Sequence, residues 1–388
     1  MWIPKLTNSI LRATLVLTFA LLAGMVANMQ GQSTFKLLHG FVGGTDGAHP
    51  TSGVSFGPKG YLYGVTIGGG AYNWGTVFSI GPGGRYKVVY TFTGGADEGF
   101  PNNQLTWVGT TLFGVTSAAG AYSQGTIFEI DTTTGIEKTL YTFTGLADGG
   151  SPDCALVPDN VGNLYGTTFY GGANGGGTIF RFAPSNGNLT TLYAFKGGTD
   201  GQYPFGRMAR DASGNLYGAT IEGGANNFGT IFGLSQSGVE KVLYTFLGWP
   251  VLDLYYPYAD LIRDSAGNLY GGGTSGGLGN GAIFKVSAAG EETIYNVPSG
   301  TAGPSHGVVT DSAGNFYGTL AADGNYGGVF KMDTSGNYTI LYTFTGGVDG
   351  ASPEGADVIR DAQGNLYGTT DSGGGQKKYG TVFELTFP

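Results

Sequence analysis

Gly-Asn-Leu-Tyr-Gly, at residues 162–166, is the stretch that decides the fold, because it recurs along the whole chain. Intact copies of this box lie at 214–218, 267–271 and 364–368, and looser copies lie at 60–64, 110–114 and 314–318. The closing glycines, at 64, 114, 166, 218, 271, 318 and 368, are 47 to 53 residues apart. A repeat of this length predicts a solenoid, a propeller or another repeat array.

The third repeat shows what one unit contains. Apolar residues 155–157 lead into a tight turn at 159–162, and the box strand follows at 164–169. After a Gly-rich loop come two more apolar runs, at 177–182 and 189–195, with a Ser-Asn-Gly turn between them. Four short runs without helical periodicity predict four strands. A four-stranded unit of about 50 residues is the size of one propeller blade.

The box itself supports packing between blades. Leu164 and Tyr165 point to opposite faces of the box strand, and both are apolar in character. Such a strand suits a blade whose two faces each contact a neighbouring blade. We expect the glycines at each end of the box to let adjacent backbones approach closely.

The two ends of the chain distinguish a closed ring from an open array. The last repeat stops at residues 383–385 without the usual Leu-Tyr-Thr-Phe strand, whereas a spare strand, Phe35 to Phe41, precedes the first box. We predict that this N-terminal strand pairs with residues 381–385 and closes the ring. The expected fold is an all-β, seven-bladed β-propeller with four-stranded blades, in a single domain at 34–388. A parallel β-solenoid, which would need polar caps, is the main alternative.

Residues 1–33 are expected to form a signal peptide. Lys5 and Arg12 precede an apolar run at 13–27, which is shorter than the roughly 18 residues of a membrane span. Cleavage is expected between Ala27 and Ser33, giving a protein that is secreted or held at the cell surface. The alternative is that this segment stays uncleaved and anchors the protein, and only in that case do we expect the protein to be attached to a membrane.

Charge and cysteine content narrow the range of partners. Without the leader the chain carries 16 Lys and Arg against 27 Asp and Glu, a net charge of −11. An acidic surface repels phosphate backbones, so nucleic acid is not an expected partner. Cys154 is the single cysteine, so no intrachain disulfide can form. We expect a monomer stabilised by packing.

Three motifs recur in this order along the chain, with variations from repeat to repeat: GNLYGTT, then GG-x(4)-GT[VI]F, then LYTFTGG-x-DG. Across residues 35–388 this combination resembles the GloVer tandem-repeat family, a choice-of-anchor group of secreted bacterial proteins. The resemblance implies export, often with a C-terminal sorting anchor, and it implies no established biochemical activity. Because the sequence ends at Phe387-Pro388 without a sorting tail, release is the expectation here.

Two sets of aspartates recur with the repeats. The first opens the turn before five of the seven boxes: Asp159, Asp211, Asp264, Asp311 and Asp361. We expect it to be structural, because Asp bonds turn amides. The second follows the LYTF strand: Asp46, Asp97, Asp148, Asp200 and Asp349. It would share one rim with aromatic loop residues, which suits sugar or peptide recognition, but turn geometry together with a solvated acidic rim is the favoured explanation. No DxDxDG loop occurs, so we expect no cofactor, with calcium a weak alternative.

Departures from the repeat are the best indication of a site. The crossover at 247–258 replaces the usual turn residues with Trp249, Asp253, Tyr255, Tyr256 and Tyr258. The next crossover, at 298–305, loses its Asp-Gly and leads into His306. We predict that these six residues bind a ligand on the crossover rim. The alternative is that the aromatic loop folds over its shortened neighbour and only fills space.

The expected function is a secreted binding or scaffold module that recognises an extracellular glycan or peptide, without catalytic residues. The alternative is a propeller hydrolase or lyase with a divalent cation in the central tunnel, near Arg207, Asp260, His306 and Asp357. A buried carboxylate cluster in the tunnel would favour the enzyme, and an apolar tunnel would favour the binding module. A third hypothesis places one binding site in every blade.

Overall fold

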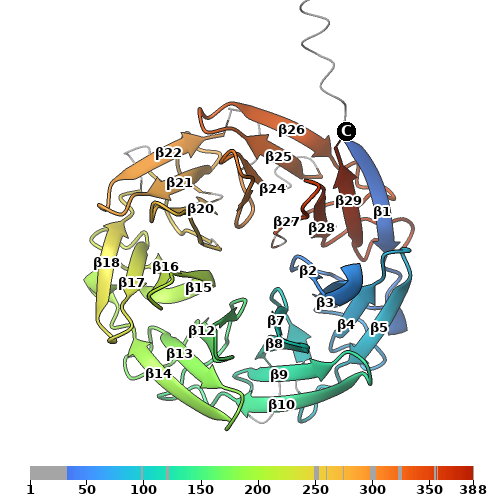
Figure 1. Ribbon diagram of the computed structural model, residues 1–388, viewed down its shortest axis with the longest axis horizontal. Helices are drawn as coiled ribbons and strands as arrows, with labels where there is room; N and C mark the ends of the chain where they lie inside the picture. The colour runs from blue at the N-terminus through green and yellow to red at the C-terminus, as the bar shows by residue number, and fades with distance from the viewer. Residues whose placement is uncertain are drawn as a thin grey trace, which may run out of the picture.

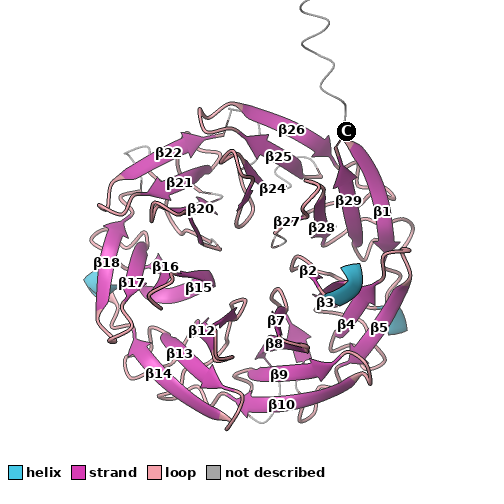
Figure 2. Ribbon diagram, viewed as in Figure 1, coloured by secondary structure: helices cyan, strands magenta, loops and turns pink. Residues whose placement is uncertain are grey.

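The computed structural model describes residues 33–97, 99–118, 122–248, 253–258, 260–273, 275–297, 303–321, 326–353, 355 and 357–387. Over these residues the strands form seven antiparallel sheets arranged around a central axis (Figure 1). Besides strands, Figure 2 shows only short helical turns in the described part of the chain, namely η1 (Gly44–Asp46), η2 (Pro58–Gly60) and η3 (Gly198–Asp200). The predicted seven-bladed β-propeller is therefore confirmed, and the solenoid is wrong.

In blades 1 to 6 the strands run outward from the central tunnel in chain order, whereas in blade 7 the first strand of the chain is outermost. Blade 1 comprises β2 (Ser55–Phe56), β3 (Leu62–Thr66), β4 (Thr76–Ile80) and β5 (Tyr86–Thr91). Blade 2 comprises β6 (Gly99–Pro101), β7 (Thr106–Val108), β8 (Thr111–Ala118), β9 (Thr126–Asp131) and β10 (Ile136–Thr142). Blade 3 comprises β11 (Val157–Pro158), β12 (Leu164–Thr168), β13 (Thr178–Ala183) and β14 (Asn188–Ala194). Blade 4 comprises β15 (Gln202–Arg210), β16 (Leu216–Glu222), β17 (Thr230–Leu234) and β18 (Glu240–Thr245).

The remaining blades follow the same order. Blade 5 comprises β19 (Ile262–Arg263), β20 (Leu269–Gly273), β21 (Ala282–Val286) and β22 (Glu292–Asn296). Blade 6 comprises β23 (Val309–Thr310), β24 (Phe316–Leu320), β25 (Gly328–Met332) and β26 (Tyr338–Thr343). Blade 7 comprises β27 (Ile359–Arg360), β28 (Leu366–Thr370), β29 (Thr381–Thr386) and β1 (Thr34–Gly40). Blade 2 departs from the predicted four strands because its inner strand is split into β6 and β7, which both pair with β8.

The ring is closed by the two ends of the described chain. β1 pairs antiparallel with β29, and this pairing places Phe35 opposite Leu385 and Leu37 opposite Phe383. The N-terminal strand thus supplies the outer strand that blade 7 lacks. The prediction that residues 35–41 pair with residues 381–385 is confirmed.

Each box strand packs on two neighbouring blades, as its sequence indicates. Leu164 belongs to the core between blades 2 and 3, whereas Tyr165 packs on the core between blades 3 and 4. The expected role of the closing glycine needs correction. A Cβ on Gly166 would lie 2.5 Å from Cζ of Phe180, so the glycine makes room for a phenyl ring of the adjacent strand rather than for backbone.

The aspartate before each box organises the turn, as predicted. Asp211 Oδ1 accepts hydrogen bonds from the backbone N–H groups of Ser213 (3.0 Å) and Asn215 (2.9 Å). Its Oδ2 accepts bonds from Asn215 Nδ2 (2.9 Å) and from the Tyr217 hydroxyl (3.0 Å). Desolvation raises the pKa of Asp211, but these bonds outweigh it and leave the pKa lowered. The motif Asp-x-x-Gly-Asn-x-Tyr is therefore one hydrogen-bonded unit.

Replacing Asp211 by alanine should lower the free energy of unfolding by about 0.5–2 kcal/mol, by analogy with the loss of another side chain that caps backbone amides. Chemical denaturation measures the change. Ser213→Ala serves as the control, because Ser213 contributes only its backbone N–H to the turn. Unchanged stability of Asp211→Ala would show that water replaces the carboxylate at little cost.

Candidate binding site at the mouth of the central tunnel

The crossovers between blades lie on one rim, and all except the one at 298–305 contain an aspartate. Asp148 accepts hydrogen bonds from the Thr144 backbone N–H (2.9 Å) and the Tyr141 hydroxyl (3.1 Å). Asp97, Asp200 and Asp349 make the equivalent pair of bonds. The second set of aspartates therefore shapes the crossovers and has few oxygens left for a ligand.

Asp253 has the same role in the irregular crossover. It is 5% exposed, and its Oδ2 accepts hydrogen bonds from the Leu247 backbone N–H (2.5 Å) and the Tyr244 hydroxyl (3.1 Å). Although the sequence around it has changed, Asp253 replaces the aspartate of the regular crossovers. Its carboxylate is turned toward its own loop.

The neighbouring aromatic residues of this crossover pack on blade 4. The rings of Tyr255 and Tyr256 lie 5.8 and 6.2 Å from the ring of Phe228, between centroids. Both tyrosines are half-buried. Trp249, the remaining aromatic residue predicted in this loop, lies outside the described residues.

Tyr258 and His306 come together through a residue that the sequence did not single out. Tyr258 is 38% exposed, and its ring meets the ring of Phe205 edge-on at 5.3 Å. The His306 ring lies 5.7 Å from the same phenyl ring. Two of the six predicted residues, from different blades, therefore share one aromatic neighbour on the rim.

Phe205 continues into a larger aromatic group. Its ring is 6.4 Å from Phe169, which stacks on Tyr203 at 5.2 Å, and Tyr170 lies 4.6 Å from Phe169. We call the whole group the aromatic arc: Phe169, Tyr170, Tyr203, Phe205, Tyr258 and His306. It extends from blade 3 to blade 6 along the crossover rim.

A signal for the missed members was present in the sequence. Blade 3 alone places two aromatic residues, Phe169-Tyr170, directly after its box strand, where blade 1 has Ile67-Gly68. In addition, Phe205 follows Pro204 just as Tyr258 follows Pro257. Comparing the repeats position by position would have shown that neighbouring blades carry aromatic residues at the same place.

Phe205, Tyr258 and His306 each precede by two residues a side chain that lines the tunnel, a cavity of about 480 Å³ lined by inner strands of several blades. Asp260 Oδ1 accepts the backbone N–H of Arg207 (2.6 Å), and Asp357 Oδ1 accepts that of Gly307 (2.8 Å). A Cβ on Gly307 would lie 2.7 Å from the Asp260 Cβ and 3.0 Å from Asp357 Oδ1. Because Gly307 of blade 6 has no side chain, the carboxyl groups of Asp260 and Asp357, from blades 5 and 7, can approach each other.

A third carboxyl group lies nearby. Asp153 Oδ1 accepts hydrogen bonds from Asn102 Nδ2 (2.7 Å) and Asn103 Nδ2 (2.9 Å). Burial raises the pKa of Asp153, while the bond from Asn103 and the neighbouring His306 act to lower it. Burial and the Asp260 carboxylate raise the pKa of Asp357 well above its ordinary value. The pair formed by Asp260 and Asp357 therefore holds a proton that isolated carboxylates would lose.

The residues named for the enzyme alternative do converge. Asp357 interacts electrostatically with Asp260 and Arg207, and Asp153 does so with His306 and Asp260. The tunnel therefore contains the kind of carboxyl pair expected to favour an enzyme, Asp260 and Asp357, within a lining whose other side chains are mostly apolar. Across the described ranges, no group of three or more His, Cys, Asp or Glu side chains is placed to hold a metal ion. In the same part of the chain, no helix has the length and apolar character needed to cross a membrane.

Comparison with known proteins identifies the repeat. The sequence profile of a family described as the Gloeobacter/Verrucomicrobia repeat matches residues 14–143, 109–278 and 251–388. A search of curated proteins finds no match.

Solved structures share the architecture at low sequence identity. The extracellular domain of a putative hybrid two-component system from B. thetaiotaomicron aligns with a TM-score of 0.55 and 12% identity, over 87% of this chain and 40% of that chain. A putative gluconolactonase aligns with a TM-score of 0.45 and 12% identity, over 92% and 93%. A nidogen/laminin complex aligns with a TM-score of 0.42 and 20% identity, over 62% and 77%. The similarity to the B. thetaiotaomicron domain supports the propeller fold, whereas the other two similarities are too weak to support a conclusion.

Proposed function

The chain belongs to the Gloeobacter/Verrucomicrobia repeat family, and from that premise we propose that it is an exported, monomeric binding module for an extracellular glycan. The ligand would lie along the aromatic arc and reach into the mouth of the tunnel. Export is inferred from residues 1–33, with their basic start and apolar run.

The aromatic arc is the observation that carries this proposal. Six aromatic side chains from four blades form one group, and Tyr170 and Tyr258 remain exposed in it. Exposed aromatic surface on a monomer marks an interaction site. Aromatic faces with polar tips suit sugar rings, which present apolar C–H faces and hydroxyl edges. The adjoining tunnel supplies the few convergent polar groups that orient a ligand.

Replacing Phe205 or Tyr258 by alanine should weaken glycan binding about tenfold or more, because a buried aromatic contact at the centre of a site contributes about 2 kcal/mol. Binding is measured by affinity electrophoresis in gels containing polysaccharides and on a glycan array. Tyr72→Ala is the matched control, because Tyr72 is 61% exposed on the same rim but belongs to blade 1.

Three outcomes separate the hypotheses. Loss of binding in the arc variants, with Tyr72→Ala unchanged, supports the proposed site. Equal weakening by Tyr72→Ala would favour one site per blade, which the stoichiometry from calorimetry would also report. Binding of peptides but not glycans in a parallel peptide array would replace the proposed ligand.

A hydrolase is the second candidate, because Asp260 and Asp357 share a site in which burial and the Asp260 carboxylate raise the pKa of Asp357. Their hydrogen-bonding contact is closer than the roughly 5–9.5 Å that separates the two carboxyl groups of most glycoside hydrolases. It resembles instead a carboxyl dyad that shares one proton and activates water. Hydrolysis products that disappear with Asp357→Asn would assign this activity. Each carboxyl group also accepts a backbone N–H from the neighbouring blade, which favours a role in holding the ring.

A further inference from the structure

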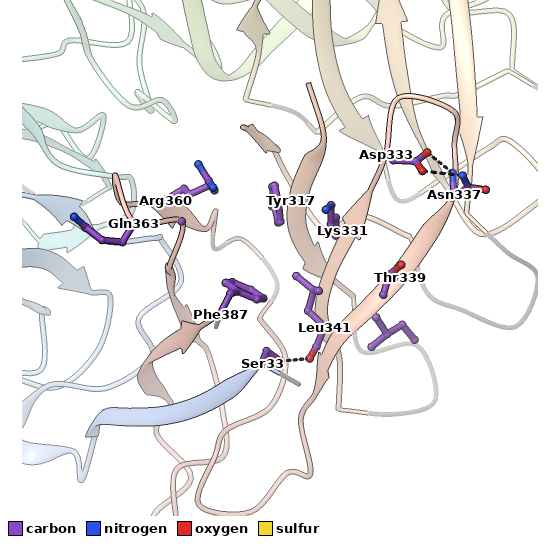
Figure 3. A pocket seen from close by; sticks show the side chains of 12 residues that line it. Ser33, Tyr317, Lys331, Asp333, Asn337, Thr339, Leu341, Arg360, Gln363 and Phe387 are labelled. Atoms are coloured by element: carbon purple, nitrogen blue, oxygen red, sulfur yellow. Dashed lines mark hydrogen bonds between the residues drawn. The ribbon is translucent and has the colours of Figure 1, made fainter. Parts of the chain in front are cut away.

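A second cavity, of about 530 Å³, lies between blades 6 and 7 on the rim opposite the aromatic arc (Figure 3). Its walls come from the β25–β26 hairpin, the turn between β27 and β28, and the chain at Ser33 and Phe387. Ser33 Oγ donates a hydrogen bond to the Leu341 carbonyl (2.6 Å) at its edge. The cavity therefore sits where the closing strand joins the two blades.

Two cationic side chains converge on one ring in this cavity. Lys331 Nζ lies 5.8 Å from the ring centroid of Tyr317, and Arg360 Cζ lies 5.6 Å from it. Figure 3 shows Tyr317 between these two side chains. Both cations are half-buried, and they come from different blades, Lys331 from β25 and Arg360 from β27.

Neither cation forms a close ion pair within the described residues, although the Asp333 carboxylate attracts Lys331 at longer range. Within the described residues, neither Lys331 nor Arg360 has a salt bridge or a hydrogen bond to another group, and Arg360 Nε is buried without a partner. Asp333, at the cavity wall, directs its carboxylate to Asn337 (Nδ2 to Oδ2, 2.7 Å). Two unpaired like charges on one ring in a partly desolvated cavity repel each other, and an anion bound in the cavity would reduce that repulsion.

Tyr317 holds the cations without removing their charge. Its hydroxyl donates a hydrogen bond to Asp311 (2.9 Å). Burial, together with that bond and the Asp311 charge, raises the pKa of Tyr317 to about 12. The ring therefore stays neutral at physiological pH and offers only cation–π attraction.

Other seams between blades show that the pair is not required by the fold. At the seam between blades 4 and 5, Arg263 lies over Tyr217 (5.3 Å), but Gly233 stands opposite Tyr217, where Lys331 stands opposite Tyr317. Two blades can therefore pack together with a single cation over the box tyrosine between them.

The seam between blades 3 and 4 comes nearest to repeating the pair. There Arg210 lies over Tyr165, and Arg181 stands opposite Tyr165 but is exposed to solvent. The two half-buried cations on one ring are therefore a feature of the blade 6–7 seam.

We propose that this cavity binds the carboxylate of an acidic sugar, a uronic acid being the simplest case. The Arg360 guanidinium matches a carboxylate in a two-pronged hydrogen bond, and Lys331 adds a second charge. Thr339 and Gln363 at the wall can bond ring hydroxyls, and Phe387 offers an apolar face. The volume lies within the range of small-molecule sites. This site is separate from the aromatic arc and does not depend on the function proposed for it.

Calorimetry with glucuronate as the probe tests the proposal, using the whole chain. Arg360→Gln and Lys331→Gln should each weaken glucuronate binding about tenfold or more, because hydrogen bonds to charged groups are among the strongest. Arg263→Gln is the matched control, since it removes an arginine from a box tyrosine at a seam without the second cation. Far-UV circular dichroism checks that each variant is folded.

Glucose and glucuronamide complete the design, because they keep the ring but lack the negative charge. The proposal predicts that neither binds and that added salt weakens glucuronate binding. It is overturned if the wild-type chain fails to bind glucuronate, if glucuronamide binds equally well, or if folded Arg360→Gln and Lys331→Gln both retain the wild-type affinity. Loss of affinity in Arg263→Gln equal to that in Arg360→Gln would also overturn it.

Discussion

Deleting residues 34–42 should lower the melting temperature more than any single substitution within a blade. β1 contributes the outer strand of blade 7, so its loss would expose the hydrogen-bonding edge of β29. It would also remove Phe35, whose ring stacks on Tyr342 at 4.5 Å. Differential scanning calorimetry measures the effect, and an unchanged melting temperature would show that the ring does not depend on this strand.

Phe41 isolates the closing contact from the loss of a whole strand. It is fully buried, its N–H donates to the Gly380 carbonyl (3.0 Å), and its ring meets Phe78 of blade 1 at 5.4 Å. Phe41→Ala should lower the free energy of unfolding by about 3–5 kcal/mol. Phe195 is the equivalent, fully buried residue at the end of β14, within the continuous part of the ring.

Comparing Phe41→Ala with Phe195→Ala separates packing from closure. Both variants lose a phenyl ring between blades, so we expect similar losses of stability. Only Phe41→Ala loosens the contact that joins the two ends of the chain, so it alone should speed proteolysis between β1 and β2. Equal proteolysis of the two variants would mean that closure adds nothing to ordinary packing between blades.

The architecture could be predicted because the same local sequence pattern recurs in successive blades. The closing glycine and the aromatic residue before it recur in every box, and five of the seven repeats add the turn aspartate at the same spacing, so one repeat predicts the structure of the others. The ends were equally informative, since a missing last strand and a spare first strand imply each other. The split inner strand of blade 2 was missed, because residues 99–108 carry no signal that distinguishes one strand from two.

The candidate site was predictable only where one blade departs from its own repeat. Tyr258 and His306 were found in this way, but Phe205, which joins them, lies in a crossover that otherwise looks regular. Asp253 looked irregular, yet it retains the hydrogen bonds of the regular crossovers. Contacts between blades depend on which residues face each other across a seam, so the pair formed by Lys331 and Arg360 could not be inferred from spacing along the chain.

Three glutamates at the outer seams should make the protein less stable as the pH rises from about 5 to 8. Each projects from the outer strand of one blade toward the crossover aspartate of the preceding blade: Glu137 near Asp97, Glu240 near Asp200, and Glu292 near Asp253. Burial, with the neighbouring aspartate adding to it, raises the pKa of Glu137 and Glu240 to about 7 and that of Glu292 to about 8.

The direction of this stability change follows from how tightly the folded and unfolded chains bind protons. A glutamate whose pKa is higher in the folded protein than in the unfolded chain binds its proton more tightly when folded. Its stabilising contribution is complete below the unfolded pKa, about 4.3, and is lost as the pH rises through the folded value. His39 opposes this trend, because burial lowers its pKa and protonating it at lower pH costs stability. Both the wild type and a glutamate variant contain His39, so comparing their stabilities at the same pH cancels its contribution.

Glu292→Gln should therefore stabilise the protein at pH 8 relative to pH 5, by on the order of 2 kcal/mol, because the amide cannot ionise. In the wild type, the Tyr244 hydroxyl lies within hydrogen-bonding distance of Glu292 Oε2 (2.6 Å) and Asp253 Oδ2 (3.1 Å), while Glu292 Oε1 is buried without a partner. A glutamine keeps the shape and can offer an N–H to the carboxylate of Asp253. Glu291→Gln, at the exposed neighbouring position, is the control and should leave the pH dependence unchanged. Urea unfolding at pH 5, 6.5 and 8 measures the difference. Parallel stability profiles for wild type and Glu292→Gln would show that Glu292 ionises without lowering the free energy of unfolding.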